Sequence, residues 1–286
     1  MRILKILCLC FAPFLLFVSG TSDNSQQALV IFSQMVKSCD ALKGARYTME
    51  KTERLCSGKH VSTRINVKLQ YNPTKVYVYS VLPAVGAEVL YVPGTNDNKL
   101  LINPNSFPYI NLSLSPDNFL IRNNQHHSIR EMGFRYINNV FKSNMLKHQD
   151  DFASHLSLEG EVDWKGRRCY KVILFNADYG FQNYQVQKGE NLVNIARKLD
   201  LSEYSLLCLN PHVDDYEDVS SGDVLRVPNS YGKTTVLYID KTWYLPLMQS
   251  ISDDKGLFEQ YEISNMIVNP VFAEDEFTPE FKDYNF

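Results

Sequence analysis

Six histidines are the side chains of this 286-residue chain best suited to binding metal ions or moving protons near neutral pH. Four of them, His126, His127, His148 and His155, lie in one stretch of the sequence. Their spacing matches neither an HExxH helix nor paired CxxC motifs, and adjacent histidines point in different directions. The sequence therefore predicts solvated loop histidines, with no metal site and no cofactor.

Carboxylates offer two other kinds of chemistry, calcium binding and glycoside hydrolysis. The acidic run at 214–218 lacks the spacing and the glycine of an EF-hand loop, so a charged surface loop is expected. Glu159, Glu161 and Asp163 alternate along one predicted strand, and no second catalytic segment accompanies them. The chain also lacks a GxSxG turn, a Cys/His signature and a phosphate-binding loop. We therefore expect no catalytic residue.

The composition is that of a folded protein with neutral or apolar partners. Hydrophobic residues make up 44% of the chain, which is enough for a sizeable core, and 286 residues can form one large or two ordinary domains. The formal net charge is -3, and no basic tract is present to collect phosphate groups. These features argue against nucleic acid as a partner.

The N-terminus has the three parts of a secretory signal peptide. Arg2 and Lys5 form a positive start, residues 6–18 form an apolar run that is short for a membrane span, and small residues follow at 19–22. Cleavage after Gly20 is expected. The mature protein would then be exported and would have no transmembrane segment.

Four cysteines remain after that cleavage: Cys39, Cys56, Cys169 and Cys208. An exported compartment permits disulfides, but four cysteines allow three pairings and none has a diagnostic spacing. Cys39 with Cys56 is the most plausible pair, because a helix end and the following strand can lie close together. We favour mostly free, buried thiols.

The elements that could present a ligand site lie in residues 184–228. This stretch is predicted as a strand, a turn at Lys188-Gly189-Glu190, two short helices and a closing strand at 224–228. Asn191 has the N-cap position of the first helix, and Asn210-Pro211 ends the second. Since the two strands can pair antiparallel, the unit can be inserted into a single β-turn of another domain.

This βααβ unit resembles a LysM domain, the small module that binds N-acetylglucosamine-containing glycans of peptidoglycan and chitin. The resemblance covers the whole unit and rests on Tyr184, Val186, Lys188-Gly189-Glu190-Asn191-Leu192, Ile195-Ala196, Leu209-Asn210-Pro211, Gly222-Asp223-Val224-Leu225 and Val227-Pro228. It implies a shallow groove with two walls, the turn after the first strand and the segment after the second helix, formed by Gly189, Glu190, Asn191, Leu192, Asn210, Pro211 and His212.

In such a groove, backbone groups would hydrogen-bond the N-acetyl substituents, and Leu192 with Pro211 would give apolar contact. Two residues depart from the family pattern, since Glu190 and Asn191 stand where Asp and Thr or Ser are usual. The alternative is a retained scaffold with little glycan affinity.

Outside this unit the chain is predicted as two helices and two groups of antiparallel strands. A helix over 28–42 precedes five strands with period-two alternation, at 47–55, 60–71, 76–82, 88–92 and 99–103. A second helix over 128–148 precedes strands at 156–164, 168–175, 235–240, 242–251 and 257–268. The acidic tail from Glu274 onward is expected to be loosely ordered.

This order of elements resembles the LolA-like group of bacterial envelope proteins, and within it an uncharacterised secreted family. The matching phrases are GRRCYKV at 166–172, VLYID at 236–240, LPL at 245–247 and GLFEQYE at 256–262. The resemblance implies an α+β fold, in which a curved antiparallel sheet forms an incomplete β-barrel with helices on its concave side. The expected organisation is a signal peptide at 1–20, a discontinuous sheet domain at 21–181 and 231–286, and a LysM-like domain at 182–230.

The same resemblance implies a cavity able to hold an acyl chain, with a completely filled core as the alternative. Our leading hypothesis is a non-enzymatic protein of the periplasm or cell envelope of a Gram-negative bacterium. Its module would bind peptidoglycan, and its sheet domain would hold a lipid, lipoprotein or other apolar ligand. The alternatives are a cell-wall hydrolase or a regulator of one, and a structural or assembly protein whose module does not bind glycan.

Overall fold

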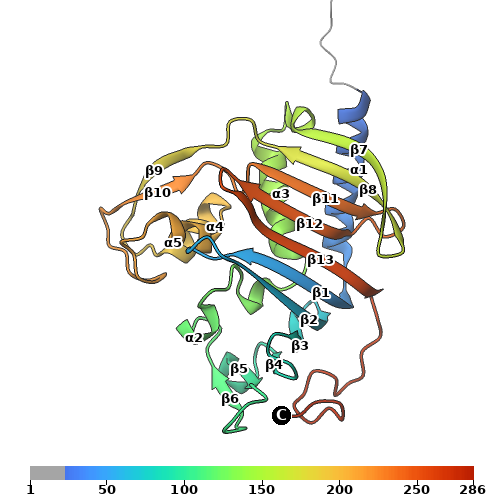
Figure 1. Ribbon diagram of the computed structural model, residues 1–286, viewed down its shortest axis with the longest axis vertical. Helices are drawn as coiled ribbons and strands as arrows, with labels where there is room; N and C mark the ends of the chain where they lie inside the picture. The colour runs from blue at the N-terminus through green and yellow to red at the C-terminus, as the bar shows by residue number, and fades with distance from the viewer. Residues whose placement is uncertain (1–22) are drawn as a thin grey trace, which may run out of the picture.

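The computed structural model describes residues 23–286. The expected signal peptide, residues 1–20, lies outside the described residues. Figure 1 shows a large antiparallel sheet, helices against one of its faces, and a small unit at one side that contains β9, α4, α5 and β10. No helix within residues 23–286 combines the length and the apolar character that a membrane-spanning helix needs.

Eleven of the described strands form one antiparallel sheet, in the order β6-β5-β4-β3-β2-β1-β13-β12-β11-β8-β7. The first meander consists of β1 (Gly44–Arg54), β2 (His60–Gln70), β3 (Lys75–Leu82), β4 (Glu88–Tyr91), β5 (Leu100–Asn103) and β6 (Leu112–Leu114). The second consists of β7 (Leu156–Trp164), β8 (Arg167–Phe175), β11 (Thr234–Asp240), β12 (Pro246–Asp253) and β13 (Gly256–Val268). β1 pairs with β13 and joins the two meanders. The predicted α+β fold with an unclosed antiparallel sheet is confirmed.

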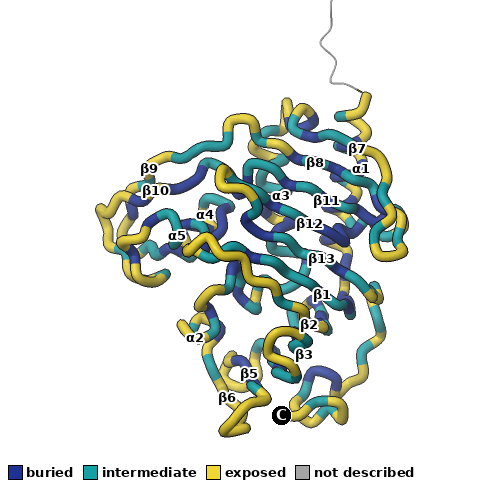
Figure 2. The backbone as a smooth tube through the Cα atoms, viewed as in Figure 1, coloured by how far each residue is buried: buried dark blue, intermediate teal, exposed yellow. Residues whose placement is uncertain are grey.

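Helices α1 (Asp23–Ala41) and α3 (Arg135–Lys147) cover one face of this sheet (Figure 1). α1 buries a stripe of side chains at helical spacing that includes Phe32. The centroid of the Phe32 ring lies 5.3 Å from that of Phe141 and 5.5 Å from that of Phe152, in the 3-10 helix η3 (Phe152–His155). The main core is therefore the layer between helices and sheet, and Figure 2 shows buried positions along the central strands.

The predicted helix over 128–148 starts later than expected. A capping box of Ser128 and Glu131 begins a separate 3-10 helix, η2 (Ile129–Glu131), and α3 begins only at Arg135. Gly133 separates the two with a φ of +94°, and a Cβ added there would lie 2.5 Å from Tyr71 Oη. Other short elements, β6, η1 (Asn96–Asn98) and α2 (Phe119–Arg122), were not predicted, because they are too short to show a period.

The expectation of a loosely ordered tail is wrong. Glu276 is buried and accepts hydrogen bonds of 2.7 and 2.6 Å from Arg46 Nη2. Farther along, the Tyr284 ring stacks on Tyr77 of β3 with 3.8 Å between centroids. The acidic residues led us to expect a loose tail. In the structure, a paired carboxylate and stacked aromatic rings stabilise the segment against the sheet.

The small unit has its own sheet and its own core. β9 (Phe181–Gln185) pairs with β10 (Val224–Pro228), and α4 (Leu192–Leu199) and α5 (Glu203–Leu209) lie between them in the chain. Nine buried residues form its interior: Val186, Leu192, Ile195, Ala196, Leu201, Leu206, Val213, Leu225 and Val227. Phe175 at the end of β8 pairs with Thr234 at the start of β11, so the unit extends from the connection of one hairpin. We call it the module, and the remainder the sheet domain.

A disulfide joins the module to the sheet domain. Cys56, in the turn between β1 and β2, is bonded to Cys208 in α5, 152 positions away. The predicted Cys39–Cys56 pair is therefore wrong, and of the four cysteines in residues 23–286 two, Cys39 and Cys169, are the free, buried thiols that we expected. The cause of the error is physical: docking of the insertion brings Cys208 to Cys56, and no local spacing encodes that docking.

Two further contacts hold the module in place. Arg122 and Glu203 form a salt bridge that is almost completely buried between the two parts. The imidazole of His126 lies between two rings, Tyr204 of α5 at 4.5 Å and Phe258 of β13 at 4.3 Å. His126 is 1% exposed, so the prediction of a solvated loop histidine is wrong for this residue.

Candidate functional site

A cavity of about 370 Å³ lies between the sheet and the segment that connects β6 to α3. Its walls come from strands β1 to β5, β12 and β13 on one side and from residues 121–137 on the other. Most lining side chains are apolar, among them Met49, Ile65, Val78, Leu100, Ile102, Ile121, Met132, Phe134 and Ile137. The volume is in the range of small-molecule sites. The core of the sheet domain is therefore not completely filled.

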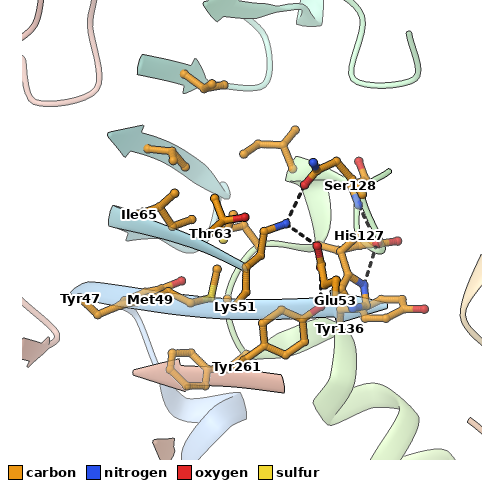
Figure 3. A pocket seen from close by; sticks show the side chains of 18 of the residues that line it. Tyr47, Met49, Lys51, Glu53, Thr63, Ile65, His127, Ser128, Tyr136 and Tyr261 are labelled. Carbon is orange, nitrogen blue, oxygen red and sulfur yellow. Dashed lines mark hydrogen bonds and ion pairs between the residues drawn. The ribbon is translucent and has the colours of Figure 1, made fainter. Parts of the chain in front are cut away.

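Strand β1 gives this cavity an apolar end and a polar end. Tyr47, Met49, Lys51 and Glu53 all line it, because residues two apart on a strand share one face. Figure 3 shows them in order along the strand, with Lys51 and Glu53 near His127 and Tyr261. The change from apolar to charged residues on one face of β1 was the signal in the sequence that we missed.

Hydrogen bonds link the side chains at the polar end. Lys51 Nζ donates to Glu53 Oε2 at 2.7 Å and to Gln125 Oε1 at 2.6 Å. The Tyr261 hydroxyl donates to Glu53 Oε1 at 2.8 Å. Burial acts to raise the pKa of Glu53, but Lys51 and then His126 outweigh it and hold that pKa below its usual value. Glu53 is thus a carboxylate whose partners fix its position.

His127 lies at the same end between two carboxylates. Its Nε2 is 3.2 Å from Glu259 Oε2, and its Nδ1 is 3.5 Å from Glu131 Oε2. Burial disfavours the imidazolium, yet Glu259 and then Glu131 outweigh that effect and raise the pKa of His127 to about 10. His127 is therefore a cation at neutral pH, and with Lys51 it places two positive charges at this end of the cavity.

Glu259 is the most deeply buried member of this cluster, with 0% exposure. It accepts from His126 Nδ1 at 2.9 Å and from the Tyr231 hydroxyl at 3.0 Å, in addition to its contact with His127. Burial acts to raise the pKa of Glu259, but His127 and His126 lower it far below its usual value. Because His126 also stacks on Tyr204 of α5, the cluster connects the polar end of the cavity with the module.

The expected groove residues fall into an exposed group and a buried group. Gly189, Pro211 and His212 are exposed, and Glu190 and Asn191 are partly exposed. Leu192 is 0% exposed and belongs to the module core, so it cannot give the apolar contact that we expected.

Asn210 is 2% exposed, and its side chain forms hydrogen bonds with backbone groups. Its amide donates to Leu206 O and Arg226 O, and its Oδ1 accepts from Arg226 N. A sugar could reach the exposed and partly exposed group only.

The two departures from the LysM pattern have structural explanations. Glu190 accepts from Lys198 Nζ and from Gln187 N, both at 2.8 Å, and these bonds lower its pKa to about 2. Asn191 caps α4 as predicted, because its Oδ1 accepts from Asn194 N at 2.9 Å. Asn191 Nδ2 also donates to Glu217 Oε1 at 2.8 Å, which ties the turn after β9 to the acidic loop.

A second hollow, of about 430 Å³, lies between the module and the sheet domain. Asn191, Arg197, Tyr216 and Glu217 line it from the module. The facing wall belongs to the segment around α2 and includes Asp117, Arg122, Asn124 and Arg130. One wall of the expected groove thus faces a polar surface of the sheet domain, which the sequence did not show.

Known proteins resemble this chain in two separate regions. Residues 184–228 match the model of the LysM domain, so the recognition of that module is confirmed. Residues 42–195 match a second family model, which extends across most of the sheet domain and into α4. No curated protein matches the chain.

Solved structures similar to this chain include several bacterial proteins. LprF from Mycobacterium bovis is 13% identical with a TM-score of 0.42, over 88% of this chain and 97% of that one. Lipoprotein LppX from Mycobacterium tuberculosis is 12% identical with a TM-score of 0.40, over 87% and 99%. A LolA superfamily protein from Nitrosomonas europaea is 10% identical with a TM-score of 0.33, over 88% and 97%. The last is described as a member of the LolA superfamily, the group that the order of elements resembles.

The second family model accounts for more than half of the 286 residues, from Leu42, two residues before β1, to Ile195 in α4. The chain therefore belongs to the family described as "Protein of unknown function (DUF1571)".

Proposed function

We propose that this chain is a non-enzymatic cell-envelope protein that binds an amphipathic, acyl-bearing ligand in its cavity and a peptidoglycan glycan through its module. The observation that carries the proposal is the cavity, whose apolar body ends in a charged cluster that contacts the module. With the signal peptide predicted for residues 1–20, this function would place the protein in the periplasm of a Gram-negative bacterium. We take residues 182–230 as the extent of the module and 21–181 with 231–286 as the sheet domain.

An amphipathic ligand fits both ends of the cavity. The apolar walls would take a hydrocarbon chain, since burying each methylene group contributes about 0.8 kcal/mol. At the other end, Lys51 Nζ has one hydrogen beyond those it donates to Glu53 and Gln125, and Gln125 offers its amide N–H groups. His127 adds positive charge there, while its two nitrogens face Glu259 and Glu131. A ligand head that carries hydrogen-bond acceptors would find donors there. A lipid or the acyl group of a lipoprotein has this combination of parts.

Glycan binding is supported by the LysM match and by the exposure of part of the expected groove. Gly189, Glu190, Asn191, Pro211 and His212 keep accessible surface on the two walls. A module of this size buries little area, so we expect weak binding that several copies would strengthen. The module would then localise the sheet domain at the cell wall.

The carboxylates at the cavity argue for a role without catalysis. A glycosidase needs one carboxylic acid with a raised pKa beside an ionised one. The pKa values of Glu53, Glu131 and Glu259 are all lowered, because each is paired with a cation. Glu203 has a raised pKa, but it is buried in a salt bridge with Arg122. A cleared band in zymography on cell-wall substrate would contradict this part of the proposal.

Glycan binding can be tested by sedimentation with insoluble peptidoglycan. We expect the double variant Pro211→Glu/His212→Ala to be retained roughly five- to thirty-fold less than the wild type, which corresponds to about 1–2 kcal/mol of binding free energy. Both residues are exposed, so the fold should be unchanged.

The matched control for the glycan test is Val30→Glu, at an exposed position on α1. Equal sedimentation of the double variant, the control and the wild type would reject glycan binding at this surface.

Ligand binding in the cavity can be tested with a fluorescent fatty acid, dansylaminoundecanoic acid. Val78 lines the cavity and is buried, and we expect Val78→Trp to fill the space and weaken binding at least ten-fold. Val61→Trp is the control, because it enlarges an exposed residue of the neighbouring strand β2 that does not line the cavity. The proposal fails if Val78→Trp binds the probe as tightly as the control.

A further inference from the structure

A group of metal-ligating side chains lies outside both the cavity and the module groove. His148, Asp151 and His155 surround the end of α3 and the 3-10 helix η3. Each offers one ligand atom, and these three atoms lie within 4.8 Å of one another. The rings of His148 and His155 are 4.9 Å apart between centroids, at an angle of 58°. The spacing of these residues in the sequence did not predict the group, because their side chains meet only after the chain changes direction between α3 and η3.

The hydrogen bond of His155 leaves one of its nitrogens free for a metal. Its Nδ1 is 3.2 Å from the carbonyl oxygen of Phe175, which can only accept, so Nδ1 carries the proton. In the neutral imidazole the lone pair is then on Nε2. This Nε2 is buried and has no hydrogen-bond partner among the described residues. The atom it faces is Asp151 Oδ2, at 3.8 Å, which is beyond hydrogen-bonding distance.

We propose that His148 Nδ1, the Asp151 carboxylate and His155 Nε2 bind a divalent transition-metal ion, with Zn²⁺ as the preferred one. Zinc takes histidine nitrogen and carboxylate oxygen at about 2.0–2.2 Å in tetrahedral geometry, which puts donor atoms roughly 3.4 Å apart. Asp151 Oδ1 lies 3.8 Å from His148 Nδ1, and Asp151 Oδ2 lies 3.8 Å from His155 Nε2. Small rotations of the more exposed His148 and Asp151 would close the remaining gap.

The donor set and its surroundings favour zinc over calcium or magnesium. Two imidazoles suit zinc and its neighbours in the first transition row, whereas calcium and magnesium take oxygen ligands. The hydrogen bond from His155 Nδ1 to the Phe175 carbonyl fixes the orientation of the ring, as a partner on the other ring nitrogen does in histidine-bound metal sites. Asp151 is mostly exposed, so water can complete the coordination from outside.

The position of the site suggests what the ion would do. Phe175 is the last residue of β8, where the chain leaves the sheet domain for the module. Lys147, one residue before His148, donates to Asn229 O on the returning segment. An ion at this place would hold the end of α3 against η3, beside the segments through which the chain enters and leaves the module. Its binding energy would stabilise this part of the sheet domain.

The test is zinc titration of metal-stripped protein without a histidine tag, by calorimetry and by the visible absorption of a Co²⁺ substitute. We expect one ion per chain and a tetrahedral Co²⁺ spectrum. His155→Ala and the conservative Asp151→Asn should each weaken zinc binding at least ten-fold. His60→Ala, which changes an exposed histidine on β2, should bind as the wild type does.

Circular dichroism and thermal melting without metal show whether the variants remain folded. Because Asp151 is exposed, Asp151→Asn should keep the fold even if His155→Ala does not. The proposal is overturned if the wild type shows no saturable zinc binding at micromolar concentration. Equal zinc affinity of folded Asp151→Asn and the wild type would overturn it as well.

Discussion

Replacing Cys56 and Cys208 with serine is expected to lower the free energy of unfolding by about 2–5 kcal/mol. The disulfide links residues 152 positions apart, so it removes a large amount of conformational entropy from the unfolded chain. The same bond holds α5 against the turn between β1 and β2. Denaturant unfolding of the double variant, followed by circular dichroism, measures the loss.

Two comparisons distinguish the effect of losing the disulfide from the effect of replacing the cysteine side chains. Wild type treated with a reductant should unfold at the same denaturant concentration as the double variant. Cys39→Ala and Cys169→Ala change free, buried thiols, so reductant should still destabilise these controls. A wild-type midpoint that reductant does not move would contradict the expected role of the bond.

The disulfide matters for function because it works together with noncovalent contacts at the same interface. The buried Arg122–Glu203 pair and the stacking of His126 on Tyr204 occur beside it. Under the proposed function, a glycan held by the module would therefore lie at a fixed place relative to the cavity. The polar hollow between Asn191 and the α2 segment would be fixed in the same way.

Much of the fold could be predicted because it follows from local pattern. Alternation along β1 and β2 gave their boundaries to within a few residues, and short turns implied antiparallel neighbours. Asn191 was recognised as the cap of α4, since N-capping depends on one side chain and the next three residues. Leu192 shows the limit of this reasoning. It has the right position in the motif, yet its side chain turns into the module core.

The features that could not be predicted all depend on contacts between distant segments. Cys208 meets Cys56 only after the module docks, and Glu276 meets Arg46 only when the tail crosses the sheet. His126 was expected in solvent because the spacing of the histidines matches no metal motif, whereas Glu259, Arg54 and Tyr204 surround it in space. A buried charged group is stable only when such partners compensate its charge, and the sequence alone does not identify them.

Removing the carboxylate of Glu259 should be among the most destabilising single changes in the protein. We expect Glu259→Gln to lower the free energy of unfolding by about 3–5 kcal/mol, because it leaves buried positive charge without its partner. Glu259 is completely buried and contacts His126, His127 and Tyr231. Glu159→Gln is the matched control, since that carboxylate is exposed on β7 and should change stability by less than about 0.5 kcal/mol.

The same cluster predicts how stability depends on pH. The pKa of His127 is raised from 6.5 to about 10, so its contribution is complete below pH 6.5 and is lost as the pH rises through 10. The ceiling of this contribution is about 5 kcal/mol. Glu259, whose pKa is lowered, contributes above its ordinary value of 4.5 and loses that contribution only in strong acid.

Urea unfolding of wild type and Glu259→Gln at pH 5.5, 7, 9 and 10 separates these effects. The difference between them should be largest at pH 5.5 and should shrink toward pH 10, because Glu259 is the main reason that His127 holds its proton. A difference that stays constant over this range would mean that Glu259 acts through packing, and that His127 is not a cation at the polar end of the cavity. The proposed site for a ligand head would then have Lys51 as its one cation among the described lining residues.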